Sequence, residues 1–250
     1  MIFLEAIEGF GKYVRMLGSL FAKPEKISMY WRETMRQMYD IGVGSFWIIA
    51  IVGLFIGGVT AVQFVNKLLT FGGFVPMWWM GSMTRDSMIL ELAPTISALL
   101  LSGKIGSNIA TELGTMRISE QIDAMDIMGV NTHAFLLGPK IVGAVIIVPT
   151  LIITAMLMGT AGGALAGVLG DYYSLEEYTF GLQDDFQPQF VRLMFIKSIV
   201  FPFLITTIAC YKGFYVKGGS IEIGKASTDA VVYSSIAVVI ANFLIAFIFL

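Results

Sequence analysis

One short stretch of the sequence has the residue types and spacing of a nucleotide phosphate site. Gly219 through Lys225 fits the first seven positions of the pattern GxxxxGK[ST], in which backbone N–H groups and the lysine hold phosphates. The eighth position is Ala226, so the hydroxyl that binds magnesium in that pattern is missing. The stretch also lies between two apolar segments, where a strand and a helix would be needed. We therefore predict no nucleotide site in this chain.

Catalytic and metal-binding side chains are equally sparse. The chain has one histidine, His133, and one cysteine, Cys210, which excludes a His-rich metal site and an internal disulfide. No serine or cysteine near His133 has the sequence of a nucleophile elbow, so a solvated loop histidine is the simpler interpretation. We expect no enzyme activity, no catalytic residue, no metal ligand and no cofactor bound by this chain.

Two charged residues interrupt apolar segments. Glu91 lies shortly before Pro94 in one such segment, and Lys197 lies shortly before Pro202 in another. An ionisable residue inside a membrane span is a candidate functional residue. Glu91 also closely follows Asp86, so a place among the lipid headgroups fits the sequence equally well. Lys197 could likewise extend its ammonium group to the outer interface.

The chain that must position these residues has the composition of an integral membrane protein. Of its 250 residues, 56% are apolar or aromatic and only 14% are charged, and the mean hydropathy is +0.80. A soluble domain carries about 25% charged residues, so this chain has too few to cover a surface in water. Its net charge of −2 argues against nucleic acid as a partner.

Charge-free runs locate the membrane spans, because a helix needs about 20 apolar residues to cross the bilayer. Uninterrupted runs predict spans near 41–66, 141–170 and 230–250. The two segments that contain Glu91 and Lys197 predict further spans near 87–103 and 193–211. We expect an all-α fold with five transmembrane helices in a single membrane domain that covers residues 1–250.

The N-terminal segment has a different pattern. Apolar residues recur every three or four positions from Phe3 to Phe21, which predicts an amphipathic helix over 1–22 that lies at the membrane interface. Packing on a soluble domain is the alternative. Twelve of the sixteen basic residues lie before the first span, after the second or after the fourth. This distribution places the N-terminus in the cytoplasm and the C-terminus outside.

The loop from Lys104 to Lys140 is the longest polar stretch between spans. Apolar side chains, several of them methionines, keep helical spacing from Ile109 to Met128, which predicts an amphipathic cytoplasmic helix. Such a helix can dock into the groove of a partner protein or lie on the membrane surface. The pattern alone leaves both possibilities open.

Glycines at four-residue spacing mark faces on which helices can approach closely. Gly53 and Gly57 form one such face in the first span, and Gly159, Gly163 and Gly167 form another in the third. Whether these faces pack within the chain or between two copies is open.

The stretch from Glu91 to Asn131 resembles the signature of the MlaE/YrbE permease family, which runs roughly ELGP…ALL.AGR.GS…AE.G.M...EQ..A...M..DP. The matching residues are Glu91, Leu92, Pro94, Ala98, Leu99, Leu100, Gly103, Gly106, Ser107, Glu112, Gly114, Met116, Glu120, Gln121, Ala124 and Met128. A second stretch, Gly224 to Val232, resembles the family sequence GVGRATTxAVV. Lys104 and Lys225 stand where the family commonly has arginine, and Asn131-Thr132 stands where it often has Asp-Pro.

The resemblance implies a function and a set of partners. Permeases of this family are the membrane subunits of ABC transporters that move phospholipids between the two membranes of diderm bacteria. It implies a homodimer in the inner membrane, two ATPase subunits that bind ATP and magnesium, a periplasmic MCE-domain protein and, in some systems, a STAS-domain protein. The alternative function classes are a stand-alone secondary transporter or channel for a hydrophobic solute and a membrane scaffold without transport.

The resemblance also assigns roles to residues. It makes the helix from Glu112 to Met128 the coupling helix that contacts the ATPase. Its expected contact residues are Glu112, Met116, Arg117, Glu120, Gln121 and Met125. The second span, with Glu91, Pro94 and Leu99, becomes a wall of the lipid cavity. Because a carboxylate repels a phosphate, we expect Glu91 to act in gating or packing rather than in headgroup binding.

Overall fold

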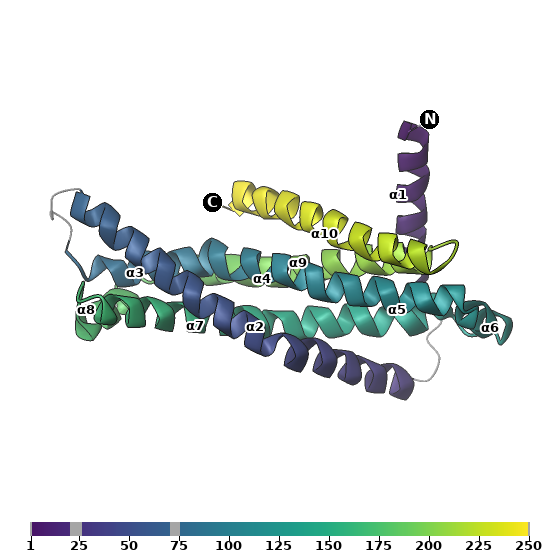
Figure 1. Cartoon of the computed structure of the whole chain (residues 1–250), viewed down its shortest axis with the longest axis horizontal. Helices are drawn as coiled ribbons and strands as arrows, with labels where there is room; N and C mark the ends of the chain where they lie inside the picture. Colours follow the sequence, from purple (N-terminus) through teal and green to yellow (C-terminus); the bar gives the residue numbers. More distant parts are fainter. Residues whose placement is uncertain (1, 21–26, 71–75, 250) are drawn as a thin grey trace. The chain divides into compact units, whose positions relative to one another are not determined.

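The computed structural model of the chain describes residues 2–20, 27–70 and 76–249. Every regular element in these ranges is a helix, which confirms the expected all-α class (Figure 1). The elements are α1 (Ile2–Ser19), α2 (Ile27–Thr70), α3 (Trp79–Ser87), η1 (Met88–Ile96), α4 (Ser97–Leu101), η2 (Ser102–Gly106), α5 (Ser107–Ile118), α6 (Gln121–Ile127), η3 (His133–Leu137), α7 (Gly138–Leu169), α8 (Leu175–Gln183), α9 (Pro188–Phe214) and α10 (Ser220–Phe249). The segments η1, η2 and η3 are π-helical.

Five helices in the described residues are long and apolar enough to cross a membrane, as the charge-free runs predict. They cover Ser28–Thr70, Trp79–Ile118, His133–Leu169, Pro188–Phe214 and Ser220–Phe249. Each contains one of the five expected spans, except that Gly170 follows the end of the third helix and residue 250 lies outside the described residues. The chain is therefore a multi-pass membrane protein.

The helices are longer than the expected spans because a charge-free run marks only the apolar part of a helix. The first span was expected near 41–66, but α2 continues in the N-terminal direction through Asp40, Arg36 and Arg32. The second span was expected near 87–103, but the helix that contains it runs from Trp79 to Ile118 through two π-helical segments. Charged residues at helix ends are compatible with helical structure and leave no mark in a search for charge-free runs.

The expected N-terminal helix over 1–22 corresponds to α1, while residues 1, 21 and 22 lie outside the described residues. Tyr13 on α1 donates a hydrogen bond from its hydroxyl to Oγ1 of Thr207 on α9, at 2.7 Å. The ring of Tyr13 also meets that of Tyr211 edge to face. A place for α1 at the membrane interface remains a prediction.

The structure divides into two compact units, each built from three stretches of the chain. One contains the described parts of residues 1–41, with 101–147 and 200–241. The other contains the described parts of 42–100, with 148–199 and 242–249. All five long helices contribute residues to both units. The expected single domain over 1–250 remains a prediction.

In the second of these units, α2 and α7 pack with their backbones almost in contact. A Cβ atom on Gly57 would overlap the carbonyl oxygen of Gly159, and one on Gly53 would lie 2.6 Å from the carbonyl oxygen of Ala155. A Cβ on Gly162 would overlap the carbonyl oxygen of Leu54. The glycines of the first span therefore pack within the chain. Small residues allow this approach because no side chain separates the two backbones.

Gly163 and Gly167 serve a different purpose from Gly159. A Cβ on Gly167 would overlap the ring of Tyr173, and one on Gly163 would lie 2.5 Å from the hydroxyl of Tyr178. The two tyrosine rings stack with centroids 5.3 Å apart, and burial raises the pKa of Tyr173 to about 12. The glycines thus make room for aromatic side chains that fix the segment after α7.

The helices α3 and α8 cross closely, as Figure 1 shows near one end of the second span. Ser82 donates a hydrogen bond to the carbonyl oxygen of Gly181 at 2.7 Å. The guanidinium group of Arg85, only 5% exposed as a residue, donates to the carbonyl oxygens of Leu182 and Asp184 at 2.8 Å. Arg85 also pairs with Asp86 at 2.8 Å. A buried cation thereby satisfies backbone carbonyls at the end of α8 that have no helical partner.

The α2–α7 contact makes a testable prediction. We expect Gly57→Ala to lower the free energy of unfolding by about 1–3 kcal/mol, because the new methyl group overlaps backbone atoms. Gly224→Ala in α10 is the matched control, since its methyl group meets no atom within 4 Å. The control should raise stability by about 0.5–1 kcal/mol. Thermal unfolding of both variants in detergent compares them, and equal stability of Gly57→Ala and wild type would contradict the described packing.

Candidate functional site

Glu91 and Lys197, which sequence reasoning treats separately, form one ion pair. The Nζ atom of Lys197 lies 2.8 Å from Oε2 of Glu91. The other carboxylate oxygen of Glu91 accepts hydrogen bonds from Thr95, at 3.0 Å, and from the amide group of Asn242. These residues lie on η1, α9 and α10, and all belong to the same compact unit. One carboxylate therefore joins three helices. We call Glu91, Lys197, Thr95 and Asn242 the polar network.

Pro94 explains why a lysine is accommodated at this place. In an α-helix, the N–H of residue 94 would donate to the carbonyl oxygen of Leu90, but proline has no N–H. That carbonyl oxygen accepts a hydrogen bond from Nζ of Lys197 at 2.7 Å. The surrounding segment is π-helical, a local departure from α-helical bonding that occurs frequently at functional sites. The proline thus removes the α-helical donor of this carbonyl, and the lysine from α9 supplies a donor from another helix.

The polar network is asymmetric in its burial. The side chain of Lys197 is 1% exposed, whereas that of Glu91 is 49% exposed. A buried ammonium group requires a partner of opposite charge, because the loss of hydration is otherwise uncompensated. Oδ1 of Asn242 is buried and accepts no hydrogen bond from the described residues. The network therefore presents a half-exposed carboxylate backed by a buried cation and one free acceptor.

The other residues expected in the lipid cavity lie in the same helix. Pro94 is buried in η1, and Leu99 lies in α4 with its side chain 37% exposed. An apolar groove of about 470 Å³ lies between α2 and α7 in the same unit. Its lining includes Phe55, Val59 and Leu165, with Gln63 as its polar member. The unit therefore combines an ion-paired polar network with an apolar groove.

The expected coupling helix is divided into two helices. α5 ends at Ile118 and α6 begins at Gln121, although the family resemblance implies one coupling helix from Glu112 to Met128. Between them, both the N–H and the hydroxyl of Ser119 donate to the carbonyl oxygen of Thr115. Glu120 has a φ of 58°, in the left-handed region. The chain therefore turns sharply at Glu120, and this turn separates Glu112 from the short helix α6.

The residues expected to contact an ATPase lie in different surroundings. Glu112 pairs with Lys140 at the start of α7, at 2.5 Å, and the lysine side chain is only 4% exposed. Arg117 pairs with Asp123 across the turn, at 2.6 Å. Glu120 and Gln121 are exposed, whereas Met116 and Met125 are half-buried. The turn thus brings Arg117, Glu120 and Gln121 together and leaves Glu112 in an ion pair between α5 and α7.

Two exposed apolar residues at the end of α6 were not expected to be functional. The side chains of Ile127 and Met128 are among the most exposed apolar residues of the described chain, at 87% and 71%. The following turn is closed by Thr132, whose hydroxyl donates to Asp126 at 2.8 Å, and by Asn131, which accepts from the N–H of Ala134. Met128 was placed at the end of the expected coupling helix and among the residues that match the family signature, but neither residue was among the expected ATPase contacts. In the sequence, the position of these two apolar residues immediately before Gly129 is the feature that could have indicated their exposure.

The structure overturns one of the sequence interpretations. His133 is half-buried rather than solvated, with its ring centroid 4.4 Å from that of Phe214. Ser220 to Lys225, within the stretch that resembles a phosphate-binding loop, form the first turns of α10. Within the described residues, no three His, Cys, Asp or Glu side chains are grouped as metal ligands.

Comparison with known proteins gives one consistent result. The family described as "Permease MlaE" matches residues 34–248. A probable ABC transporter permease protein of Rickettsia bellii is 33% identical over 87% of this chain and 83% of its own length. The intermembrane phospholipid transport system permease protein MlaE of Haemophilus influenzae is 31% identical over 92% of this chain and 87% of its own. A probable ABC transporter permease protein of Synechocystis is 31% identical over 85% of this chain and 80% of its own. This membrane protein therefore belongs to the MlaE permease family.

Proposed function

We propose that this chain is the permease subunit of an ABC transporter that moves phospholipids between the inner and outer membranes. The observation that carries the proposal is the polar network around Glu91, a compensated charge inside a helix apolar enough to span a membrane. The membership in the MlaE permease family and the name of the Haemophilus influenzae relative support it.

The proposal includes the partners that such a permease needs. A second copy of the chain completes the lipid path, and two ATPase subunits bind ATP and magnesium. A periplasmic MCE-domain protein delivers or accepts lipid, and a STAS-domain protein is an optional further subunit. The chain lies in the bacterial inner membrane with its N-terminus in the cytoplasm and its C-terminus in the periplasm, as the distribution of lysine and arginine favours.

A phospholipid has two acyl chains and a phosphate, and the second compact unit offers features suited to each. The apolar groove between α2 and α7 suits acyl chains, because it removes apolar surface from contact with polar groups. At the polar network, Lys197 offsets the charge of Glu91, so a phosphate nearby meets an almost neutral pair rather than an isolated carboxylate.

The polar network also supplies a gate in this proposal. Glu91 on η1 is bound to Lys197 on α9 and to Asn242 on α10, so these helices separate only if its hydrogen bonds are broken or exchanged. During such an exchange, a donor released from Glu91 can form a hydrogen bond with the free acceptor Oδ1 of Asn242. Opening and closing of the lipid path then corresponds to two arrangements of this network.

Coupling to ATP hydrolysis is assigned to the turn at Glu120. Closure of the ATPase dimer pushes on the surface formed by Arg117, Glu120 and Gln121, and α5 transmits the displacement along the same continuous helix that contains Glu91. The exposed side chains of Ile127 and Met128 suit an apolar groove of the ATPase, because methionine and isoleucine lose unfavourable contact with water when they dock there.

The gating role of Glu91 predicts a separable effect on stability and transport. Glu91→Gln leaves the Lys197 ammonium buried without an opposite charge. Because Glu91 is half-exposed, we expect the free energy of unfolding to fall by less than the about 3–5 kcal/mol lost when a fully buried pair loses one partner. The double variant Glu91→Gln/Lys197→Met removes both charges and should regain most of that stability. We expect neither variant to transport fluorescent phospholipid in proteoliposomes that contain the chain and its ATPase.

Matched controls separate gating from packing. Glu176→Gln alters an exposed carboxylate on α8 and should leave both stability and transport unchanged. If the double variant transports lipid at the wild-type rate, the pair only packs the helices and the gating role is wrong. If wild-type transport needs no ATP, a stand-alone transporter replaces the proposed function.

A charge exchange tests the coupling surface. Arg117→Glu places two carboxylates face to face, because Asp123 is its partner at 2.6 Å, and we expect loss of lipid-stimulated ATP hydrolysis. Arg117→Glu/Asp123→Arg restores an ion pair within the chain but reverses the charges shown to the ATPase. We therefore expect the double variant to assemble and to remain uncoupled. Wild-type coupling in the double variant would show that Arg117 acts only within its own chain.

Assembly with the ATPase tests the proposed role of the apolar side chains at the end of α6. We expect Ile127→Ser/Met128→Ser to reduce the amount of ATPase that purifies with the chain at least tenfold, since both side chains lose their apolar contacts with the groove. Leu175→Ser on α8 is the control, because it removes an exposed apolar side chain, at 56%, that lies outside α5 and α6. Equal recovery of ATPase with both variants would contradict the assignment.

A further inference from the structure

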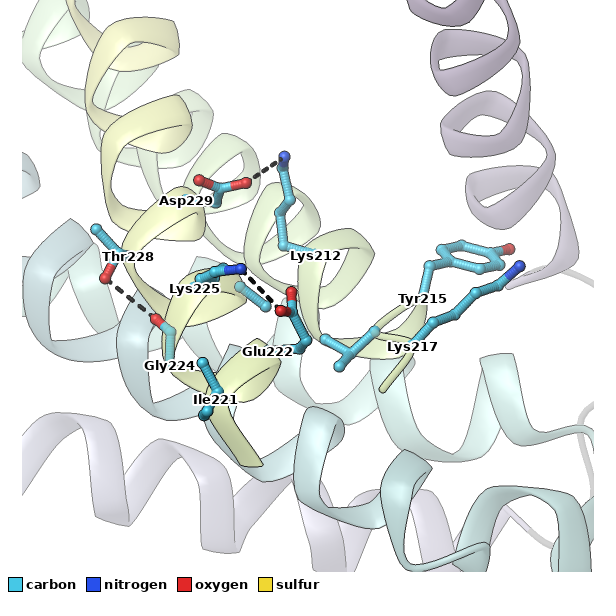
Figure 2. A pocket seen from close by; sticks show the side chains of 11 residues that line it. Lys212, Tyr215, Lys217, Ile221, Glu222, Gly224, Lys225, Thr228 and Asp229 are labelled. Atoms are coloured by element: carbon cyan, nitrogen blue, oxygen red, sulfur yellow. Dashed lines mark hydrogen bonds and ion pairs between the residues drawn. The ribbon is translucent and has the colours of Figure 1, made fainter. Parts of the chain in front are cut away.

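An open cavity lies at the junction between α9 and α10. It is not part of the proposed transport path. The cavity has a volume of about 690 Å³, and its lining includes Lys212, Lys217 and Lys225 together with Glu222 and Asp229 (Figure 2). All its lining residues belong to one compact unit. None of them belongs to the polar network around Glu91. The cavity is therefore a separate feature with a high density of charged side chains.

The charges of this cavity do not cancel. Lys212 pairs with Asp229 at 3.1 Å, and Lys225 pairs with Glu222 at 2.8 Å. Lys217 makes no ion pair with any residue that the structure describes, and Figure 2 shows its side chain pointing away from both pairs. Three lysines against two carboxylates leave one positive charge. The cavity is thus complementary to a ligand with a single net negative charge.

Tyrosines place the cavity at the depth of lipid headgroups. The rings of Tyr13 on the amphipathic helix α1, Tyr211 and Tyr215 contact one another in sequence, with centroids 5.8 and 5.2 Å apart. Tyr215 lines the cavity, and Nζ of Lys212 lies 3.9 Å from the ring centroid of Tyr233. Tyrosines gather at membrane–water interfaces because their rings are apolar and their hydroxyls polar. Burial raises the pKa of Tyr215, so its hydroxyl remains a donor for a phosphate oxygen.

We infer that this cavity binds the headgroup of an anionic phospholipid from the adjoining leaflet. Lys217 supplies the uncompensated positive charge, Tyr215 supplies a hydroxyl donor, and the phosphodiester supplies one negative charge. A zwitterionic lipid is a poorer match, because its ammonium group cancels the phosphate charge. Lysines that face the headgroup layer attract anionic lipids in general, and here they line a cavity of definite volume.

Direct binding to the full-length chain in detergent micelles tests the inference. Native mass spectrometry measures the occupancy of dioctanoyl phosphatidylglycerol, with dioctanoyl phosphatidylcholine as the zwitterionic probe. We expect wild type to prefer phosphatidylglycerol and Lys217→Gln to bind it about fivefold more weakly, the effect of one lysine near a lipid surface. Lys217→Arg should bind as wild type does. Asp229→Asn frees Lys212 from its partner and should bind about fivefold more tightly.

Three outcomes would overturn the inference. One is equal affinity of wild type for the two lipids, and another is unchanged affinity in Lys217→Gln. The third is displacement of phosphatidylglycerol by equimolar inorganic phosphate, which would identify a site for the free ion. Lys67→Gln is the charge-matched control, since it removes an exposed lysine near the end of α2 and should change nothing. These measurements use no ATP and no partner protein, so their result is independent of the transport function proposed above.

Discussion

The ammonium group of Lys197 is almost completely buried in a helix that is apolar enough to cross a membrane, and no other charge in the described structure constrains its surroundings as strongly. A lone cation in that position would be highly unfavourable, so Glu91 must stay within reach of it. The carbonyl oxygen of Leu90, whose α-helical donor Pro94 removes, adds a second acceptor. Glu91 and Pro94 on one helix and Lys197 on a helix distant in sequence therefore stabilise one another. The positions of η1, α9 and α10 in their unit follow from that mutual dependence.

The same principle recurs wherever the backbone departs from regular α-helix. Arg85 supplies donors to carbonyls at the end of α8 that have no helical partner, and Ser119 supplies a second donor to the carbonyl of Thr115 where α5 ends. In a membrane protein such groups are costly when unpaired, because hydrocarbon offers no replacement for water. Two buried cations of this chain, Arg85 and Lys197, thus lie where backbone carbonyls accept their hydrogen bonds.

Much of the fold follows from composition and from the order of charges along the chain. Runs without charge locate three of the five long helices, and apolar segments with a single charge locate the other two, because crossing the bilayer requires about 20 apolar residues. The pairing of Glu91 with Lys197 could not be predicted, since it depends on how two distant helices pack. The turn at Glu120 was missed for a related reason. Apolar spacing continues through it, and a left-handed glutamate leaves no sign in the pattern. His133 appeared to be solvated because its aromatic partner, Phe214, is remote in sequence.

The interlocked glycines of α2 and α7 limit which motions the protein can perform. Where two backbones touch without side chains between them, neither helix can slide or rotate alone without collision between carbonyl groups. The paired segments must therefore travel as one rigid body during any conformational cycle. Flexibility has to come from elsewhere, and the π-helical segments η1 and η2 are the places in the second span where helical bonding is already irregular. Glycine usually increases the conformational freedom of a chain. Here it restricts the motion of two helices relative to each other, because it lets their backbones touch.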